Sequence, residues 1–278
     1  MKVGRFEVKV INAGFLAMDC GGIFGIIPKT IWQKKVTPDE HNRLKMPTNC
    51  LLLISDDRKI LVDTGVGNGI GDKLRKIYNI QDETNIESSL AENGLTPKDI
   101  TDVIVTHLHF DHAGGVMDHK IKKPFFPNAR YYTSEEQFHW ANNPTMIDRA
   151  SYKSRNYKSV YDAGRMQLLK NGEQPIEGMK FYYTKGHTPG LICLEIEDEN
   201  QPVYYCTDIF PTSHHVPVHY ISAYDLHPLE LLKEKRFFLK KLLENDGVLV
   251  FPHDTKTTAA SVELNNDDIQ INRTFNII

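Results

Sequence analysis

One short segment constrains this chain more than any other. Residues 106–115 read THLHFDHAGG and directly follow an apolar stretch that is predicted to be a strand. Imidazole nitrogens and carboxylate oxygens are the usual ligands of zinc and similar divalent ions. In a loop at a strand end, His107 and His109 can face one side, and Asp111 and His112 can face the other. The segment therefore predicts a metal site with ligands for two ions, because a chance run is improbable when the chain holds 12 histidines in 278 residues.

Three more ligand-type residues stand just beyond predicted strands. They are His187 within Gly-His-Thr-Pro-Gly at residues 186–190, Asp208 and His253. Loops at strand ends are where a rigid sheet presents functional side chains. Each of them has a structural explanation when taken singly: His187 could be a turn residue, Asp208 a helix N-cap, and His253 a partly exposed surface residue. Together with the first segment they make a set of five histidines and two aspartates, which these separate explanations do not account for.

The apolar pattern predicts many strands and few helices. Strands are predicted over residues 6–11, 50–54, 59–62, 103–105, 129–132, 181–184, 191–196, 203–206 and 248–251. Helices are predicted over residues 85–93, 134–141 and 228–244, with a short one beginning at 96–97. The order suggests two similar halves. No Pro/Ser-rich linker divides them, so we expect a single domain over residues 1–278.

Two segments are predicted to be less regular. The glycine-rich residues 14–27 are predicted to form an irregular loop. Residues 142–170 are weakly periodic and are predicted to be a helical or loop insertion between the halves. The basic residues of this insertion either attract an anionic substrate or form a solvated face; they are Arg149, Lys153, Arg155 and Lys158.

The composition limits the binding partners and the cell compartment that we expect for this chain. The chain has 33 Lys and Arg against 36 Asp and Glu, so no charge pattern indicates binding of nucleic acid or of an anionic membrane. No stretch approaches the ~18 apolar residues that a membrane span needs, and the first ten residues suggest a strand rather than a signal peptide. Its four cysteines form no C-x-x-C pair. We therefore expect a cytoplasmic protein with reduced thiols and a small-molecule substrate.

At this point the chain resembles a known family. The H-x-H-x-D-H run, the later G-H-T-P-G, an Asp after a strand and a final His are similar to the metallo-β-lactamase superfamily of hydrolases. The similarity extends from Asp63-Thr64-Gly65 to His253. It implies an α+β fold, a four-layer αββα sandwich with two facing sheets, outer helices and a metal site at one edge of the sheets.

The resemblance also implies a ligand set for two divalent metal ions. The first ion would be held by His107, His109 and His187. The second would be held by Asp111, His112 and His253, and Asp208 would bridge the two. Zinc is the foremost candidate, although such His and Asp sites also accept manganese, iron or nickel.

Further roles follow from the same resemblance. Asp63 matches a family aspartate that orients a ligand histidine, although a plain strand-end turn residue is the alternative. A metal-bridging hydroxide would attack the substrate, and Asp111 or Asp208 would pass the proton to the leaving group. Relatives are often dimers, which leaves a homodimer open.

Differences between this chain and other branches of the superfamily favour one group of hydrolases. The main β-lactamases have Arg in place of His112 and Cys in place of Asp208, which argues against antibiotic hydrolysis. The motifs are similar to N-acyl homoserine lactonases and related phosphotriesterase-like enzymes, and also to glyoxalase II thioesterases. After His253 the only basic residues are Lys256 and Arg273, too few for the basic C-terminal segment of glyoxalase II.

We therefore expect a hydrolase that opens a lactone or cleaves a related ester. A phosphotriesterase or a glyoxalase II-like thioesterase is the alternative, and a non-catalytic metal-binding sensor is the second. Some lactonases carry a tyrosine three residues after the bridging Asp, where this chain has Pro211. The sequence leaves five substitutes open: Phe210, His214, His215, Tyr220 and Tyr224.

Overall fold

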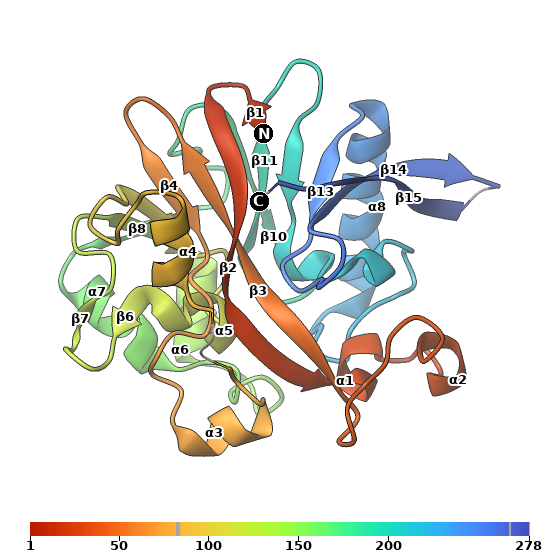
Figure 1. The fold of residues 1–278 in the computed structure, drawn as a ribbon, viewed down its shortest axis with the longest axis horizontal. Coiled ribbons are helices and arrows are strands. Elements are labelled where there is room, and N and C mark those ends of the chain that lie inside the picture. The colour runs from red at the N-terminus through yellow and green to blue at the C-terminus, as the bar shows by residue number, and fades with distance from the viewer. Residues whose placement is uncertain (82–83, 267, 278) are drawn as a thin grey trace.

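Two β-sheets lie face to face, with helices on their outer sides (Figure 1). The computed structural model describes residues 1–81, 84–266 and 268–277. The seven-stranded sheet has the order β1 (Lys2–Val3), β2 (Phe6–Asp19), β3 (Arg43–Ile54), β4 (Lys59–Val62), β5 (Asp102–Ile104), β8 (Arg130–Ser134) and β9 (Met166–Leu169). The six-stranded sheet has the order β10 (Met179–Thr184), β11 (Leu191–Ile196), β12 (Val203–Tyr205), β13 (Val248–Val250), β14 (Ala259–Asn265) and β15 (Asp268–Phe275). The expected four-layer αββα sandwich is confirmed.

The helices cover the outer faces of the two sheets. α4 (Ile86–Glu92), α6 (Glu135–Asn142) and α7 (Lys158–Asp162) lie on the side of the seven-stranded sheet, and α8 (Pro228–Glu244) lies on the side of the six-stranded sheet (Figure 1). Short elements fill the connections: α1 (Cys20–Phe24), α2 (Lys29–Trp32), α3 (Asp72–Ile77), α5 (Phe110–Ala113), β6 (Met117–Asp118) and β7 (Lys123–Pro124). No helix in the described ranges has the length and hydropathy to cross a membrane.

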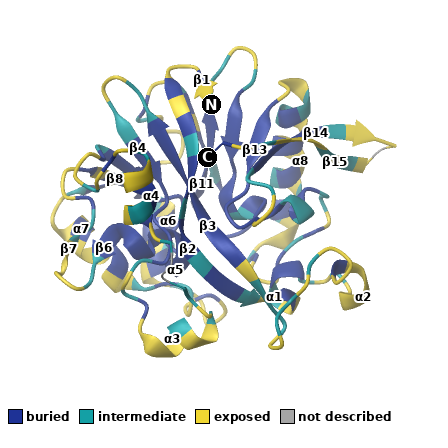
Figure 2. Ribbon diagram, in the orientation of Figure 1, coloured by how far each residue is buried: buried dark blue, intermediate teal, exposed yellow. Residues whose placement is uncertain are grey.

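Three apolar layers hold the sandwich together. Between the sheets, side chains such as Val8 and Val62 pack with Ile192 and Val250 from the opposite sheet. A second cluster lies between the seven-stranded sheet and its helices, and a third joins the six-stranded sheet to α8. Both sheets are therefore buried on two faces, as Figure 2 shows for their central strands. This burial explains why strands such as β11 are apolar at nearly every position rather than at alternate ones.

Parallel pairing determines where the site lies. In the first sheet β4, β5 and β8 run parallel, and in the second β12 runs parallel to β13. The carboxyl ends of parallel neighbours meet at one edge of a sheet, and their loops point the same way. Asp63 directly follows β4, and His107 stands three residues after β5, Asp208 three after β12 and His253 three after β13. The ligand-type residues therefore gather at one edge of the sandwich.

Several helix boundaries agree with the sequence because local caps determine them. Asn85 caps α4, and its side chain accepts hydrogen bonds from the backbone of Glu87 and Ser88. Ser134 caps α6 in the same manner, and α8 begins at Pro228 as expected. The helix expected at 96–97 is wrong: Thr96 starts a turn, and its backbone and hydroxyl both donate to Asp99.

The irregular loop expected over residues 14–27 is also wrong. β2 continues to Asp19, paired with β3 from Phe15 opposite Pro47 to Asp19 opposite Arg43, with an irregularity between Asn12 and Phe15. Gly14 lies in that irregularity with φ of 122°, which other residues rarely adopt. Gly14 therefore interrupts the regular pairing without ending the strand, because β3 supplies the backbone partners on both sides of it.

Two further differences concern strands at sheet edges. The stretch 142–170 holds turns and α7, as expected of a helical or loop insertion, but its last part forms β9 beside β8. After His253, β14 and β15 form a hairpin that extends the second sheet. β9 depends on a partner earlier in the chain, with Met166 opposite Tyr131, whereas β14 and β15 pair with near neighbours in sequence.

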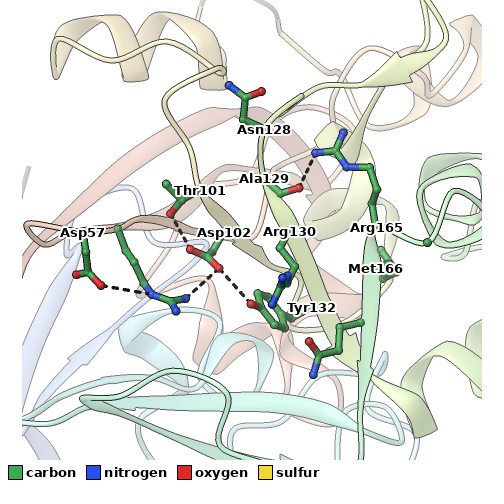
Figure 3. Close-up of a pocket in the computed structure, with 12 residues that line it drawn as sticks. Asp57, Thr101, Asp102, Asn128, Ala129, Arg130, Tyr132, Arg165 and Met166 are labelled. Carbon is green, nitrogen blue, oxygen red and sulfur yellow. Dashed lines mark hydrogen bonds and ion pairs between the residues drawn. The ribbon is translucent and has the colours of Figure 1, made fainter.

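A wide polar groove of about 890 Å³ lies at the opposite edge of the first sheet (Figure 3). Its buried acid, Asp102, accepts hydrogen bonds from Arg58 at 3.1 Å, Thr101 at 2.6 Å and Tyr132 at 3.1 Å. The groove lies at the start of β5, β8 and β9, whereas the histidines follow the strand ends. Its size therefore does not identify the reactive site.

Candidate metal centre

The loop after β5 is locked against the loop after β4. The carboxylate of Asp63 accepts hydrogen bonds from the backbone and hydroxyl of Thr106 at 2.8 and 2.9 Å. The backbone of Thr64 donates to the carbonyl of His112 at 2.8 Å. A Cβ on Gly114 would fall on the carbonyl oxygen of Val66, so only glycine allows the two loops to approach this closely. The histidine-rich segment is therefore held by the sheet edge itself.

Three imidazoles form the first group. His107 Nε2 lies 3.1 Å from His109 Nδ1, and His187 Nε2 lies 3.2 Å from the same nitrogen. All three side chains are buried, although they come from two loops 78 residues apart. The ring of Tyr152, from the 142–170 segment, lies 4.8 Å from the ring of His109. That segment therefore closes one side of the group.

A second group lies beside the first. Asp111, His112 and His253 place one ligand atom each within 4.8 Å of one another. His112 Nε2 lies 3.3 Å from His253 Nε2, and Asp111 Oδ2 lies 3.9 and 3.8 Å from these two nitrogens. The first group, with Asp208, satisfies the same 4.8 Å limit. All seven side chains expected from the sequence are therefore brought together.

Asp208 lies between the groups and faces both. Its Oδ2 is 3.3 Å from His187 Nε2 and 3.7 Å from His107 Nε2. Its Oδ1 is 3.3 Å from His112 Nε2 and 3.2 Å from His253 Nε2. The two oxygens of one carboxylate thus face different sets of nitrogens, which is the arrangement that a bridging ligand requires.

Hydrogen bonds on the far side of the rings set their orientation. The Nδ1 atoms of three histidines donate to fixed acceptors: His112 to Asp63 at 2.9 Å, His187 to Asp225 at 2.8 Å, and His253 to the carbonyl of Pro47 at 2.9 Å. An imidazole that donates through Nδ1 presents the lone pair of Nε2. Each Nε2 therefore points at Asp208 as a potential ligand atom.

Burial and charge act on these groups in opposite directions. Burial, reinforced by neighbouring imidazoles, holds the pKa of His107 and His109 well below the usual range. Burial would also lower the pKa of His112, but Asp208 and Asp63 outweigh it and raise that pKa. For Asp208, burial favours the protonated acid, but His112 and His253 prevail and hold its pKa well below normal. The centre therefore contains two imidazoles held neutral, His107 and His109, and an ionised carboxylate whose charge raises the pKa of His112.

This donor set suits divalent cations. Asp208 Oδ1 is buried and accepts no hydrogen bond of good geometry from the described residues. A buried ionised oxygen without such a bond costs free energy, and a cation would remove that cost. Imidazole nitrogens around one carboxylate, here four around Asp208, are the ligands that zinc and similar ions prefer.

Two supporting interactions were not expected from the sequence. Asp225 is buried and fixes His187, and its second oxygen accepts from the backbone of Ser222 at 2.7 Å. Glu234 on α8 accepts hydrogen bonds from the backbone of Lys185 and Gly186, which ties the His187 loop to that helix. The sequence around Asp225, three residues before α8, does not indicate that this carboxylate orients a histidine, because its partner His187 lies 38 residues earlier.

A narrow cavity of about 50 Å³ opens onto the centre. Its walls include Met18, Ile23, Met46, Tyr78 and Tyr224, together with five of the seven metal-type residues. Tyr224 is the one candidate among the five substitutes for the lactonase tyrosine that lines this cavity in the described structure. Phe210 and His215 are instead buried, and His215 is bonded to Thr212 and to the carbonyl of Ile23.

Comparison with known proteins is decisive at the level of family. The family model described as the metallo-beta-lactamase superfamily matches residues 44–253. The chain belongs to this superfamily. The matched region begins in β3 and ends at His253, so it contains all seven residues of the centre.

Individual members of the superfamily add detail. The N-acyl homoserine lactonase of Bacillus cereus is 28% identical over 182 residues, which is 60% of this chain and 64% of the lactonase. The chain therefore matches less than two thirds of that relative. A probable metal-dependent hydrolase from Staphylococcus aureus is 28% identical with a TM-score of 0.88, covering 99% of this chain and 100% of its own. AidC, a dizinc quorum-quenching lactonase, shares the fold at 21% identity with a TM-score of 0.79, over 99% of this chain and 97% of its own.

Proposed function

We propose that this protein is a hydrolase that opens lactones or cleaves related esters with the help of two divalent metal ions, zinc foremost. The observation that carries the proposal is the position of Asp208, whose two oxygens face separate sets of histidines at 3.2–3.7 Å. Bound in such a pair, divalent ions activate a water and polarise a carbonyl. The lactonase relatives in the superfamily support the choice of substrate class.

The chain's own residues have separate tasks in this proposal. His107, His109 and His187 hold one ion, and Asp111, His112 and His253 hold the other. Asp63 and Asp225 keep two of the rings in place by accepting from Nδ1. Hydrolysis adds the water oxygen to the carbonyl carbon, breaks the bond from that carbon to the leaving oxygen, and requires a proton on that oxygen.

Asp111 is the better placed of the two aspartates to carry that proton. Asp208 is approached by four imidazole nitrogens, whereas Asp111 is approached by two, at 3.8 and 3.9 Å. Asp111 also lines the narrow cavity where the substrate would lie. The site needs no serine or cysteine nucleophile, so no covalent intermediate is expected.

A substrate panel tests the proposal. One metal-loaded preparation is assayed with an acyl homoserine lactone, an aryl phosphotriester and a glutathione thioester. We expect the lactone to give the highest kcat/KM. A faster phosphotriester or thioester would replace the proposed substrate class by one of these alternatives. Metal uptake without turnover of any of the three would favour the metal-binding sensor.

Tyr224 is proposed to stabilise the charge that develops on the carbonyl oxygen. Burial, together with Tyr78, Asp19 and Asp111, raises the pKa of Tyr224 to about 12, so the phenol stays protonated and can donate. It shares the narrow cavity with Asp111 and Asp208. We expect Tyr224→Phe to lower kcat roughly 10- to 100-fold without loss of metal, somewhat less than removal of an oxyanion-hole donor elsewhere.

Tyr220→Phe is the matched control, because Tyr220 packs in an apolar cluster with Phe24 and Trp32 and does not line the narrow cavity. Both variants are compared by kcat and by metal content. Equal kcat for the two variants would exclude Tyr224 from this role.

A further inference from the structure

A second pocket adjoins the candidate centre and differs from it in charge. It measures about 370 Å³ and shares His253 with the narrow cavity. Its walls come from the segment after α2, the start of β3, and the loops that follow β12 and β13. Three lysines from three of these segments line it: Lys35, Lys45 and Lys256.

The pocket has an excess of positive charge within the described structure, because three lysines and a single aspartate line it. None of the three ammonium groups forms an ion pair among the described residues. Lys35 Nζ lies 5.6 Å over the ring of Tyr220, and Lys45 Nζ lies 4.5 Å over the ring of Phe15. The single acidic wall residue, Asp254, is already occupied by other donors. Its Oδ2 accepts from the backbone and hydroxyl of Ser213 at 2.9 and 2.6 Å, and its Oδ1 accepts from two backbone amides at 2.8 Å.

His214 adds a polar group without adding charge. Burial lowers the pKa of His214; Asp254 opposes this, whereas Lys35 and Lys256 act in the same direction as burial. Two lysines from separate segments therefore act on one ring in this pocket. A neutral imidazole beside two ammonium groups can donate a hydrogen bond to an anionic oxygen.

Three of the four basic residues named above for the 142–170 segment are engaged elsewhere. Lys153 Nζ donates to the carbonyl of Ala150 at 2.7 Å, Arg155 donates to the carbonyl of Gly69, and Lys158 pairs with Asp162 at 3.5 Å. These side chains therefore contribute to local structure, and the pocket beside His253 is the better location for an anionic group.

We propose that the substrate carries an anionic group, a carboxylate or a phosphate, which the pocket of Lys35, Lys45 and Lys256 binds while the reacting lactone or ester occupies the narrow cavity at the metal centre. This rests on the proposed function and names a class of substrate within it. The apolar walls of the narrow cavity, including Met18 and Met46, suit the uncharged reacting part. Selection then comes from charge as well as from the bond that is cleaved.

The test uses two γ-lactones that differ at one side-chain group. One carries a carboxylate and the other the carboxamide of nearly the same shape, and both are assayed with the metal-loaded wild-type protein. We expect kcat/KM to be at least about tenfold higher for the carboxylate, mainly through KM, and the advantage to shrink as salt is raised. Lys256→Glu is expected to abolish that advantage.

Lys240→Glu makes the same change of charge on α8 at a side chain that does not line the pocket, and it should leave the advantage intact. Equal kcat/KM for the two lactones, or equal effects of the two lysine variants, would overturn this inference alone. Failure of the wild-type protein to open either lactone would instead overturn the proposed function.

Discussion

Replacing Asp208 by alanine is expected to remove nearly all activity, with kcat/KM falling by about 10³-fold or more. Asp208 is the one side chain in the described structure that approaches nitrogens of both groups. In the proposed two-metal centre, its loss would remove the shared ligand and leave five imidazoles without a carboxylate between them. We therefore expect the metal content of Asp208→Ala to fall for both ions, as measured by elemental analysis after dialysis.

Asp111→Asn is the informative comparison for this experiment. Asp111 approaches His112 and His253 and belongs to the second group. Its amide variant should therefore lose one ion and keep the other. An Asp208→Ala protein that retained two ions and its activity would contradict the bridging position.

Replacing Lys235 by methionine is expected to give the largest loss of stability, about 3–5 kcal/mol in the free energy of unfolding. Lys235 lies on the inner side of α8 with 0% of its surface exposed. Its Nζ donates to the carbonyls of His215, Pro217 and Tyr220 at 2.6, 2.9 and 2.6 Å. Methionine keeps the length of the side chain but leaves three carbonyls without this donor.

Lys233→Met provides the matched control on the same helix. Lys233 is 68% exposed and pairs only with Glu230 at 2.7 Å, a surface ion pair of low value. Urea unfolding of both variants should show a change within about 0.5 kcal/mol for Lys233→Met. A Lys235→Met protein as stable as the control would mean that the buried Nζ group does not hold the 215–220 loop.

Local patterns predict the parts of this fold that local physics controls. The limits of β11 and α8 agree with the sequence because an apolar run and a proline start define them within a few residues. The loops of the centre also follow from the sequence, since His187, Asp208 and His253 each stand after an apolar strand. Parallel pairing then brings these strand ends to one edge.

The sequence does not predict which distant segments contact one another. Nothing around Asp225 indicates that it fixes His187, and nothing in the weakly periodic 142–170 segment indicates that Tyr152 covers His109. β2 continues through Gly14 only because β3 lies beside it. The pocket of three lysines could not be predicted for the same reason. Its lysines come from segments separated by up to 221 residues (from Lys35 to Lys256) and meet only in the folded chain.

The most direct test of the two-metal account is anomalous diffraction from crystals of the zinc-loaded protein. The account predicts two zinc peaks per chain, one among His107, His109 and His187 and one among Asp111, His112 and His253, with a separate oxygen of Asp208 bound to each. A single peak, or two peaks of which only one contacts Asp208, would contradict it.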